Sequence, residues 1–520
     1  MKTISILMTS DTHGYWLGGE TNNLLQTAQG LKQLKLTKDH PTLMIDLGDF
    51  IQGSSFATYM YKIQGSGQFF AKAMNAIGYD YQIIGNHEFN YGADYRQAVF
   101  ADLKAPILNS NMVNTSDGQP FVGQPYAIHE IDGIKIGIIG ATTHYIPNWE
   151  LPEHYQGITF KDAFQTVKEY AELLRPQVDV LIVAYHGGFE SDLTDFSPLE
   201  RHTGENQGAR MLQEIEGIDL LLTGHQHRHI NQKVGNTWVV QAGYGGEYIA
   251  DITLTLDDDH PVDTVGQLHA TADFPEDASL KAYLAADLDA GNSWLQTVIG
   301  HAPLKPVTSN TFEARVGGHP FIEMLNQIQL IETGAQFSAI ALINDNFAAF
   351  TGDITNETLL LSYPYYNRIA RVNITGNALR EVIEYDLEYL VLNEHDLITV
   401  NPKYIEPKPR HYNFDIYSGL QVTVDLRQAF GQRIVALVDE ATGNDIVDGD
   451  MYSIALSQYR AAGGGDFKQF NVDKIAYLSD NDVASLLGDA VAGTLALNWE
   501  AINANYQHWV YQPPFKPTLD

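Results

Sequence analysis

Five short apolar segments in the first half of the chain each end in a residue that can bind a metal ion. The third segment, residues 81–84, leads into Gly85-Asn86-His87-Glu88. The amide oxygen of Asn86 can ligate a metal without adding charge, and the imidazole of His87 can donate to a developing oxyanion. The other four segments lead into Asp11-Thr12-His13, Gly48-Asp49, His186-Gly187-Gly188 and Gly224-His225-Gln226-His227. In a layered α/β domain, the carboxyl ends of such strands meet at one edge of a sheet. The sequence therefore predicts a site for two metal ions at that edge.

The predicted ligands are carboxylates, imidazoles and one amide, namely Asp11, His13, Asp49, Asn86, His186, His225 and His227. Asp11 and His13 are two residues apart, as are His225 and His227, so each pair can face one ion from an extended segment. Asp49 is a natural carboxylate to bridge two ions. Oxygen and nitrogen ligands without sulfur favour Mn, Fe, Zn or Mg. Two such ions, about 3.5–4 Å apart, would hold a bridging hydroxide and neutralise a phosphoryl group.

Each of these residues has a structural alternative when it is taken alone. Asp11 can cap a helix, Asp49 can serve a Gly-Asp turn, and a histidine that ends a buried strand can simply be hydrogen-bonded. The chain has 18 histidines, and we expect most of them to be structural or solvated. The joint pattern of five strand ends favours the metal site over these alternatives.

Length, cysteine content and charge set wider limits on the chain. Its 520 residues exceed what one hydrophobic core usually serves, so two domains are expected. The absence of cysteine excludes disulfides, thiolate ligands and a cysteine nucleophile. The net charge of −33 repels nucleic-acid polymers and anionic membranes. A phosphate substrate would therefore need local positive charge, for which bound metal ions are the obvious source.

The sequence shows no recognisable targeting or membrane-spanning segment. Met1-Lys2-Thr3 leads directly into the first apolar segment, which leaves no room for a signal peptide. No run of about 18 apolar residues is present. The expected location is the cytoplasm, and no feature indicates an oligomeric state.

The expected fold class is α/β (α+β), with two domains joined by a helix. Up to about residue 255, strand-like segments alternate with helical patterns at residues 24–34, 69–77, 164–174 and 211–215. Residues 1–275 form the predicted metal-binding domain, and residues 276–298 the connecting helix. Residues 299–520 form the second domain. Its helices are expected near residues 320–329 and 376–389, and its strands at residues 369–374, 421–426 and 451–456.

The motifs Asp-x-His, Gly-Asp, Gly-Asn-His-Glu, a His after the fourth strand, and Gly-His-x-His together resemble those of the calcineurin-like metallophosphoesterases. The resemblance covers roughly residues 4–255. It implies a four-layered α/β/β/α sandwich and a binuclear centre with the seven ligands named above. His87 would then stabilise the transition state or help to protonate the leaving oxygen, which makes His87 and its neighbour Asn86 the candidate catalytic residues.

The second domain is similar to the substrate domain of the 5′-nucleotidase superfamily, which implies a pocket for a nucleoside. The matching features are Gly352-Asp353-Ile354-Thr355 and Gly463-Gly464-Gly465-Asp466-Phe467. The 5′-nucleotidases usually have Asp where Asn90 stands and Arg where Asn346 stands.

Three stretches instead resemble the 2′,3′-cyclic-nucleotide 2′-phosphodiesterase/3′-nucleotidase branch of this superfamily. They are residues 86–92, Tyr412-Asn413-Phe414-Asp415 and residues 459–465. Ser457, Gln458 and Asp466 depart from the residues common in that branch.

Aromatic residues of the second domain are candidates for binding the base. Tyr412 or Phe414 on one side and Tyr459 on the other could sandwich it, each stack contributing roughly 1–3 kcal/mol. Gly463 and Gly464 would let the backbone approach the ribose closely. The alternative is that these aromatics are core residues of a chain with 28 tyrosines. In the first domain, Asn109 at another strand end is a candidate phosphate contact.

The preferred function is that of a metal-dependent hydrolase of nucleotide phosphoesters, acting as a 2′,3′-cyclic-nucleotide 2′-phosphodiesterase with 3′-nucleotidase activity. A hydroxide held by two divalent metal ions would attack phosphorus, and the ribose oxygen would leave opposite to it. The expected partner is a small-molecule nucleotide, not a nucleic-acid polymer or a membrane. The alternatives are a 5′-nucleotidase or nucleotide-sugar hydrolase with the same metals, a phosphoesterase with a non-nucleotide substrate, and an inactive binding protein.

Overall fold

The computed structural model describes residues 1–17, 23–257, 260–365, 367–406 and 409–516. The chain divides into two compact units, Met1–Trp294 and Leu295–Asp520. Within the described ranges, every helix is too short or too polar to cross a membrane.

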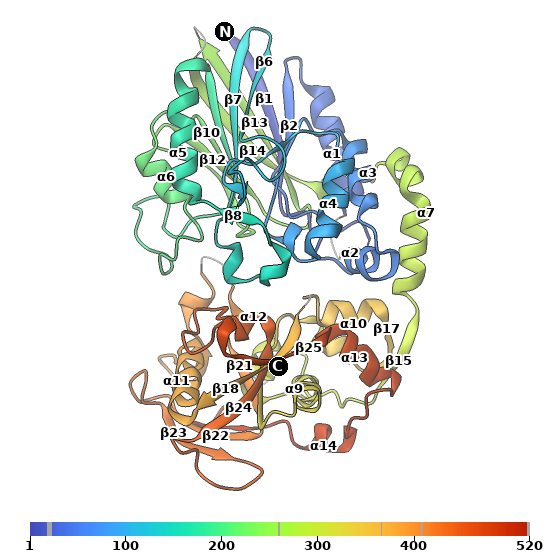
Figure 1. Cartoon of the computed structure of the whole chain (residues 1–520), viewed down its shortest axis with the longest axis vertical. Coiled ribbons are helices and arrows are strands. Elements are labelled where there is room, and N and C mark those ends of the chain that lie inside the picture. Colours follow the sequence, from blue (N-terminus) through green and yellow to red (C-terminus); the bar gives the residue numbers. More distant parts are fainter. Residues whose placement is uncertain (18–22, 258–259, 366, 407–408, 517–520) are drawn as a thin grey trace. The chain divides into compact units, whose positions relative to one another are not determined.

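The first unit is built on two six-stranded sheets (Figure 1). The first sheet has the order β14 (His260–Ala270), β13 (Tyr248–Asp257), β1 (Lys2–Thr9), β2 (Thr42–Asp46), β3 (Tyr81–Ile83) and β4 (Ile107–Leu108). The second sheet has the order β11 (His229–Val234), β12 (Thr237–Ala242), β10 (Leu220–Thr223), β9 (Val180–His186), β7 (Ile134–Thr142) and β6 (Tyr126–Ile131). Strands β1 to β4 are parallel, and so are β7, β9, β10 and β12. Each sheet therefore presents several carboxyl strand ends on one side.

The helices of the first unit pack on the outer faces of both sheets and on one another. They are α1 (Leu24–Thr37), α2 (Ser55–Tyr59), α3 (Gln68–Ile77), α4 (Gly92–Asp102), α5 (Ala163–Leu174), α6 (Gly208–Glu214) and α7 (Ala278–Leu295). The short strands β5 (Met112–Asn114) and β8 (Ile158–Phe160) pair with each other. Helix α1 begins with a capping box, in which the side chain of Asn23 accepts from the backbone of Gln26 and the side chain of Gln26 accepts from the backbone of Asn23.

Two apolar cores hold these layers together. Between the sheets, residues of both, such as Ile45 and Leu222, pack in one fully buried cluster. On the outer face of the second sheet, Val183 packs with Phe164 and Val167 of α5. The predicted four-layered α/β/β/α sandwich is confirmed.

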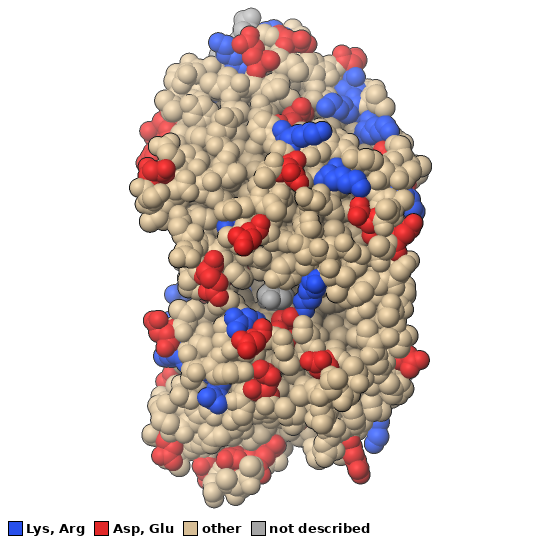
Figure 2. Space-filling view, turned by 45° about the vertical axis from the view of Figure 1, so that its right-hand side comes forward, with Lys and Arg blue, Asp and Glu red and all other residues tan. Residues whose placement is uncertain are grey.

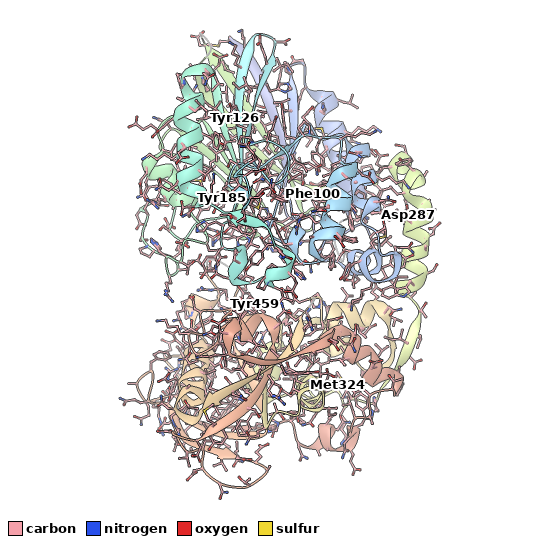
Figure 3. All side chains as sticks on the ribbon, in the orientation of Figure 1. Phe100, Tyr126, Tyr185, Asp287, Met324 and Tyr459 are labelled. Carbon is pink, nitrogen blue, oxygen red and sulfur yellow. The ribbon has the colours of Figure 1, made fainter. Side chains whose placement is uncertain are left out.

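Helix α7 and Asp277, the residue just before it, contact helices α1, α2 and α3 through ion pairs and an aromatic contact. Lys32 of α1 lies 3.4 Å from Asp277, and Lys72 of α3 lies 3.0 Å from Asp287 (Figure 3). The ring of Trp294 lies 5.5 Å from that of Tyr59. On the face drawn in Figure 2, Lys and Arg side chains likewise lie among Asp and Glu side chains.

The second unit contains a five-stranded sheet and smaller sheets. The five-stranded sheet has the order β21 (Asp415–Ser418), β16 (Phe337–Ala341), β24 (Met451–Ser457), β18 (Arg368–Thr375) and β25 (Ile475–Asp482). The smaller sheets are β23 (Ile434–Asp439), β22 (Leu420–Asp425) and β26 (Trp509–Gln512), the pair β15 (Val298–Ala302) and β17 (Gly352–Thr355), and the pair β19 (Leu390–Leu392) and β20 (Ile398–Val400).

The helices of the second unit pack on these sheets and on one another. They are α8 (Thr311–Gly317), α9 (Pro320–Thr333), α10 (Asn356–Ser362), α11 (Gly376–Asp386), α12 (Gln458–Ala461), α13 (Val483–Ala492) and α14 (Trp499–Ala504). Helix α9 lies against the five-stranded sheet, with Met324 fully buried (Figure 3). The predicted α/β fold class with two domains is confirmed.

Candidate metal centre

Five strands of the first unit end at the predicted ligands. Strands β1, β2 and β3 of the first sheet lead into Asp11, Asp49 and Asn86. Strand β9 of the second sheet ends at His186, and β10 leads into His225. The prediction of a single sheet edge was therefore wrong. The packed sheets bring two sets of strand ends together, because one apolar core lies between them.

Five of the predicted ligands have the left-handed backbone conformation that side chains other than glycine rarely adopt. Their φ angles lie between 49° and 68°, for Asp11, His13, Asp49, His225 and His227. Among the described residues, only nine that are not glycine have positive φ. Such strain is concentrated at functional sites, where the surrounding structure holds it in place.

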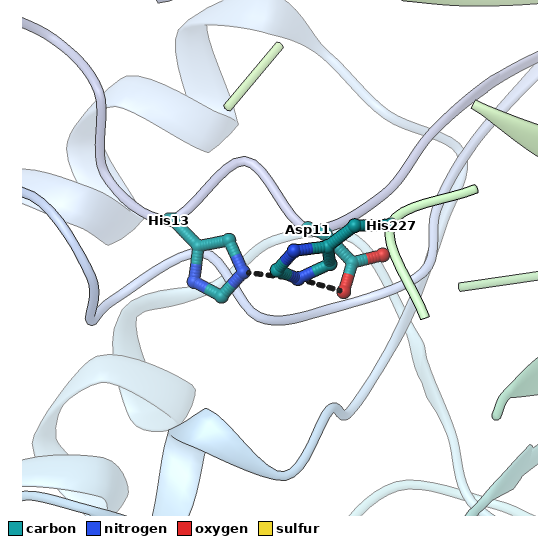
Figure 4. A group of neighbouring side chains, drawn as sticks. All are labelled: Asp11, His13 and His227. Atoms are coloured by element: carbon teal, nitrogen blue, oxygen red, sulfur yellow. Dashed lines mark hydrogen bonds and ion pairs between the residues drawn. The ribbon is translucent and has the colours of Figure 1, made fainter. Parts of the chain in front are cut away.

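Asp11, His13 and His227 form one group with their ligand atoms close together (Figure 4). The Nε2 atoms of His13 and His227 are 3.0 Å apart, and His227 Nε2 lies 3.5 Å from Asp11 Oδ1. Asp11 and Asp49 form a second group with His186, whose Nε2 lies 3.1 Å from Asp49 Oδ2.

Asn86 joins the remaining predicted ligands to these groups. Its Oδ1 lies 3.2 Å from His186 Nε2 and 2.8 Å from His225 Nδ1. The backbone N–H of His225 donates to the carboxylate of Asp11 at 3.0 and 3.1 Å. The structure thus brings all seven predicted ligands together.

Three of the imidazoles have an acceptor beside their outer nitrogen, which is the ring nitrogen that points away from the other ligands. His13 Nδ1 donates to the carbonyl of Gln52 at 2.8 Å, and His186 Nδ1 donates to that of Leu47 at 2.7 Å. His225 Nε2 lies 2.9 Å from the carboxylate of Glu205. Because these acceptors take the outer proton, each neutral imidazole would direct the lone pair of its inner nitrogen toward a cation placed among the carboxylate and amide oxygens. This arrangement fits a divalent cation, since ligating histidines are oriented in the same way.

Charge and burial act in opposite directions on the ionisable groups. Burial, followed by the nearby His87, lowers the pKa of His13, which favours the neutral form that ligates metals. Burial would raise the pKa of Asp49, but His186 and His87 outweigh it and hold that pKa well below its ordinary value. Burial would lower the pKa of His186, but Asp49 and Asp11 raise it to about 10. A metal ion would compete with that proton, so metal binding is expected to release it.

Glu88 supports the centre, although the sequence analysis gave it no role. Its fully buried carboxylate accepts from the backbone N–H groups of Asp49, Phe50 and Gly85 at 2.9, 2.8 and 2.7 Å. Burial and the nearby Asp49 raise its pKa to about 7. Glu88 therefore ties the loop after β2 to the loop after β3. Its position in Gly-Asn-His-Glu was the only sequence signal for this role.

His87, the candidate catalytic imidazole, lies beside the ligand groups. Its backbone N–H donates to Asp49 Oδ1 at 2.7 Å, and its ring lies 5.0 Å from that of His13. Its Nδ1 lies 2.6 Å from Asn90 Oδ1. The hydrogen-bonding capacity of His87 Nδ1 is thus used by the side chain of Asn90.

Asn109, the candidate phosphate contact, is buried and bonded within its own loop. Its Nδ2 donates to the carbonyls of Met112 and Val122 at 2.8 and 3.3 Å, and its Oδ1 accepts from Met112 N at 3.0 Å. Both amide protons are therefore used by backbone carbonyls, which leaves no donor for a phosphate group. This geometry indicates a structural role instead.

The candidate base-binding residues all belong to the second unit, where they differ in exposure. Phe414 is fully buried and stacks on Tyr389 with 4.8 Å between ring centroids, whereas Tyr412 and Tyr459 are partly exposed. Of the two alternatives on one side of the base, the burial of Phe414 favours Tyr412. A Cβ atom at Gly464 would lie 2.5 Å from the ring of Tyr459, so glycine is needed there for close packing.

Arg460 connects these candidates, and sequence reasoning missed its role. Its guanidinium binds Asp415 through two nitrogens at 2.7 and 3.1 Å and donates to the carbonyl of Tyr412 at 2.8 Å. It also donates to the carbonyl of Gly464 at 2.5 Å. The segments that carry Tyr412 and the glycine run are thus joined by one buried side chain.

Two protein families match the chain. The calcineurin-like phosphoesterases match residues 4–229, and the 5′-nucleotidase C-terminal domain matches residues 298–472. A solved protein of Staphylococcus aureus, named as a candidate 5′-nucleotidase, is 30% identical with a TM-score of 0.90 over 98% of this chain and 100% of that one. This chain belongs to the calcineurin-like phosphoesterases of the 5′-nucleotidase superfamily. The predicted family and enzyme class are confirmed, and the centre above contains Asp and His groups placed to bind metal ions.

Two further relatives are relevant to which branch of the superfamily this chain resembles. The 2′,3′-cyclic-nucleotide 2′-phosphodiesterase/3′-nucleotidase of Salmonella typhimurium is 25% identical over 86% of this chain and 78% of that protein. The trifunctional nucleotide phosphoesterase of Bacillus subtilis is 25% identical over 96% of this chain. The chain spans 38% of the length of the Bacillus protein.

Proposed function

We propose that this phosphoesterase binds two divalent metal ions and hydrolyses 2′,3′-cyclic nucleotides and 3′-nucleotides. The observation that carries the proposal is the convergence of seven oxygen and nitrogen ligands from five strand ends around His87. Asp11, His13 and His227 would hold one ion, and Asn86, His186 and His225 the other, with Asp49 shared. Bound there, the ions would activate a water molecule and neutralise the phosphoryl oxygens.

His87 would act on the phosphate from beside the metal ligands. Asn90 fixes its outer nitrogen at 2.6 Å, so Nε2 is the nitrogen left for a phosphoryl or leaving oxygen. An imidazole in this role typically contributes about 10²–10⁴ in rate. We expect His87→Gln to lower kcat by such a factor while the metal content stays unchanged. His301→Gln, an exposed histidine of the second unit, is the matched control.

In the second unit, Tyr412 and Tyr459 would bind the base, and Gly463 and Gly464 would lie against the ribose. Asn90 and Asn346 both support the 2′,3′-cyclic and 3′ assignment, because 5′-nucleotidases usually have Asp and Arg there. The Salmonella relative carries those two activities in its name.

The test is phosphate release with added Mn²⁺ from 2′,3′-cyclic AMP, 3′-AMP and 5′-AMP side by side, with a phosphatase added for the cyclic diester. We expect turnover of the cyclic and 3′ substrates with weak 5′ activity. Dominant hydrolysis of 5′-AMP would instead support a 5′-nucleotidase, as the name of the Staphylococcus relative suggests. If the metal-loaded protein releases no phosphate from any of the three compounds, the proposal of a nucleotide substrate is wrong.

A further inference from the structure

A half-buried carboxylate accepts a hydrogen bond from the residue that holds His87. Asn90 Oδ1 lies 2.6 Å from His87 Nδ1, and Asn90 Nδ2 donates to Glu150 Oε1. Glu150 is 60 residues away in the sequence and only 11% exposed. His87, Asn90 and Glu150 thus form a chain of two consecutive hydrogen bonds.

The chemistry of Glu150 decides which way the Asn90 amide points. An ionised carboxylate only accepts hydrogen bonds, so it must face the NH₂ group of Asn90. The carbonyl oxygen of Asn90 then faces His87, which must donate from Nδ1. This order fixes both the ring orientation of His87 and the nitrogen that carries its outer proton.

Glu150 is itself held in place on two sides. Its Oε2 lies 2.6 Å from His154 Nδ1, four residues further along the chain. The backbone carbonyl of His154 accepts from Arg96 Nη1 of α4 at 3.0 Å. Arg96 is buried, with its guanidinium 4.3 Å from the ring centroid of Phe89. The segment that carries Glu150 is therefore anchored to α4, just after the loop that holds His87.

We infer that Glu150 is a positioning residue for catalysis, which orients His87 through Asn90. The inference rests on the proposed function, because it assumes that His87 acts on the substrate. Where 5′-nucleotidases usually place an aspartate directly on the imidazole, this chain places an amide there and the carboxylate one hydrogen bond further out. The two positions are then coupled by charge, since an aspartate at position 90 would face Glu150 directly.

The coupling between positions 90 and 150 predicts that substitutions at the two positions change kcat non-additively. Glu150→Ala removes the acceptor and is expected to lower kcat about ten- to a hundredfold with little change in KM. Asn90→Asp sets two carboxylates against each other and is expected to lower kcat as well. In the double variant Asn90→Asp/Glu150→Gln, the glutamine amide donates to the new carboxylate, which accepts from His87. We expect kcat of the double variant to exceed that of Asn90→Asp at least several-fold.

The readouts separate orientation of His87 from mere stability of the loop. kcat and KM are measured for Glu150→Ala and for the four members of the cycle, which are the wild type, Asn90→Asp, Glu150→Gln and the double variant, together with metal content and thermal unfolding. Glu153→Ala, an exposed acid of the same segment, is the matched control and should leave kcat unchanged. Rescue of kcat in the double variant, at unchanged metal content, supports the inference.

Two results would overturn the inference while the proposed function stands. One is a fully active Glu150→Ala variant, and the other is a cycle in which the two losses simply add, as they do for independent sites. Wild-type protein that turns over no nucleotide when metal-loaded would instead mark a failure of the proposed function.

Discussion

At the scale of single residues, the centre depends on glycines that allow side chains to approach backbone. A Cβ atom at Gly85 would lie 2.0 Å from Asp49 Oδ1 and 2.6 Å from Asp49 N. Gly85→Ala must therefore displace the shared carboxylate or the loop that carries Asn86. We expect metal content to fall and the free energy of unfolding to drop by about 1–3 kcal/mol. Plasma mass spectrometry and urea unfolding measure the two effects.

The control for Gly85→Ala is Gly449→Ala, where an added Cβ meets no atom within 4 Å. That variant should match the wild type in both measurements. Full metal content in Gly85→Ala would contradict the close contact with Asp49.

The residues that converge at the centre were predictable, but the residues that support them were not. Asp11, Asp49 and His186 follow apolar segments directly, so their placement follows from the strands alone. Glu205 and Glu150 act across 20 and 60 residues, and no local pattern marks such contacts. That the seven residues ligate metal ions stays a prediction.

At the scale of elements, one buried histidine joins three segments of the second unit. His508, just before β26, lies 2.9 Å from Glu323 of α9 and 2.8 Å from Glu440. Burial would lower the pKa of His508, but its hydrogen bonds to the two glutamates raise it to about 9. A pKa raised on folding stabilises the fold fully below about pH 6.5, and this stabilisation is lost as the pH rises through about 9.

We expect the wild type to lose on the order of 3 kcal/mol more than His508→Gln between pH 6 and pH 10. Urea unfolding of both proteins at the two pH values measures this difference, because the other titrating groups cancel between them. An identical pH dependence of the two proteins would show that the charged histidine contributes no stability.

Arg460 is the corresponding link between α12, β21 and the glycine run. Its side chain is 3% exposed and pairs with Asp415, and its positive charge also opposes the rise in the pKa of Asp386, which burial and Asp415 produce. Arg460→Met leaves these carboxylates buried without a cation and should cost about 3–5 kcal/mol in urea unfolding. The double variant Arg460→Met/Asp415→Asn should recover part of that loss.

The pair of Arg427 and Asp425, in which the arginine side chain is 61% exposed, provides the comparison for Arg460. Arg427→Met should lower the free energy of unfolding less than Arg460→Met does, because solvent screens the exposed guanidinium of Arg427. If Arg460→Met and Arg427→Met lower the free energy of unfolding equally, the buried pair contributes no more to stability than the pair with the exposed arginine.

Most elements follow from periodicity, but their assembly into sheets does not. Residues 369–374 and 451–456 resemble strands in their sequence, and they lie in β18 and β24. The apolar segments that end at Asp49 and His186 look alike in sequence but belong to different sheets. A continuous apolar segment indicates that a strand is covered on both faces. It does not indicate which sheet the strand joins.

At the scale of the whole molecule, charge and metal binding are linked. A chain with net charge −33 gathers two aspartates and four histidines around Asn86 in its first unit. Without cations, the buried carboxylates and an anionic substrate would repel each other. Length was enough to predict two domains, and the order of the motifs was enough to predict the family, because both can be read directly from the sequence.

The central claim is that the strand ends of the first unit hold two metal ions. Anomalous diffraction from crystals of the Mn²⁺-loaded protein tests it most directly. We expect two peaks about 3.5–4 Å apart, one beside Asp11, His13 and His227 and the other beside Asn86, His186 and His225, with Asp49 between them. Asp49→Asn should weaken both peaks. A single peak, or peaks elsewhere in a protein that still releases phosphate, would contradict the account.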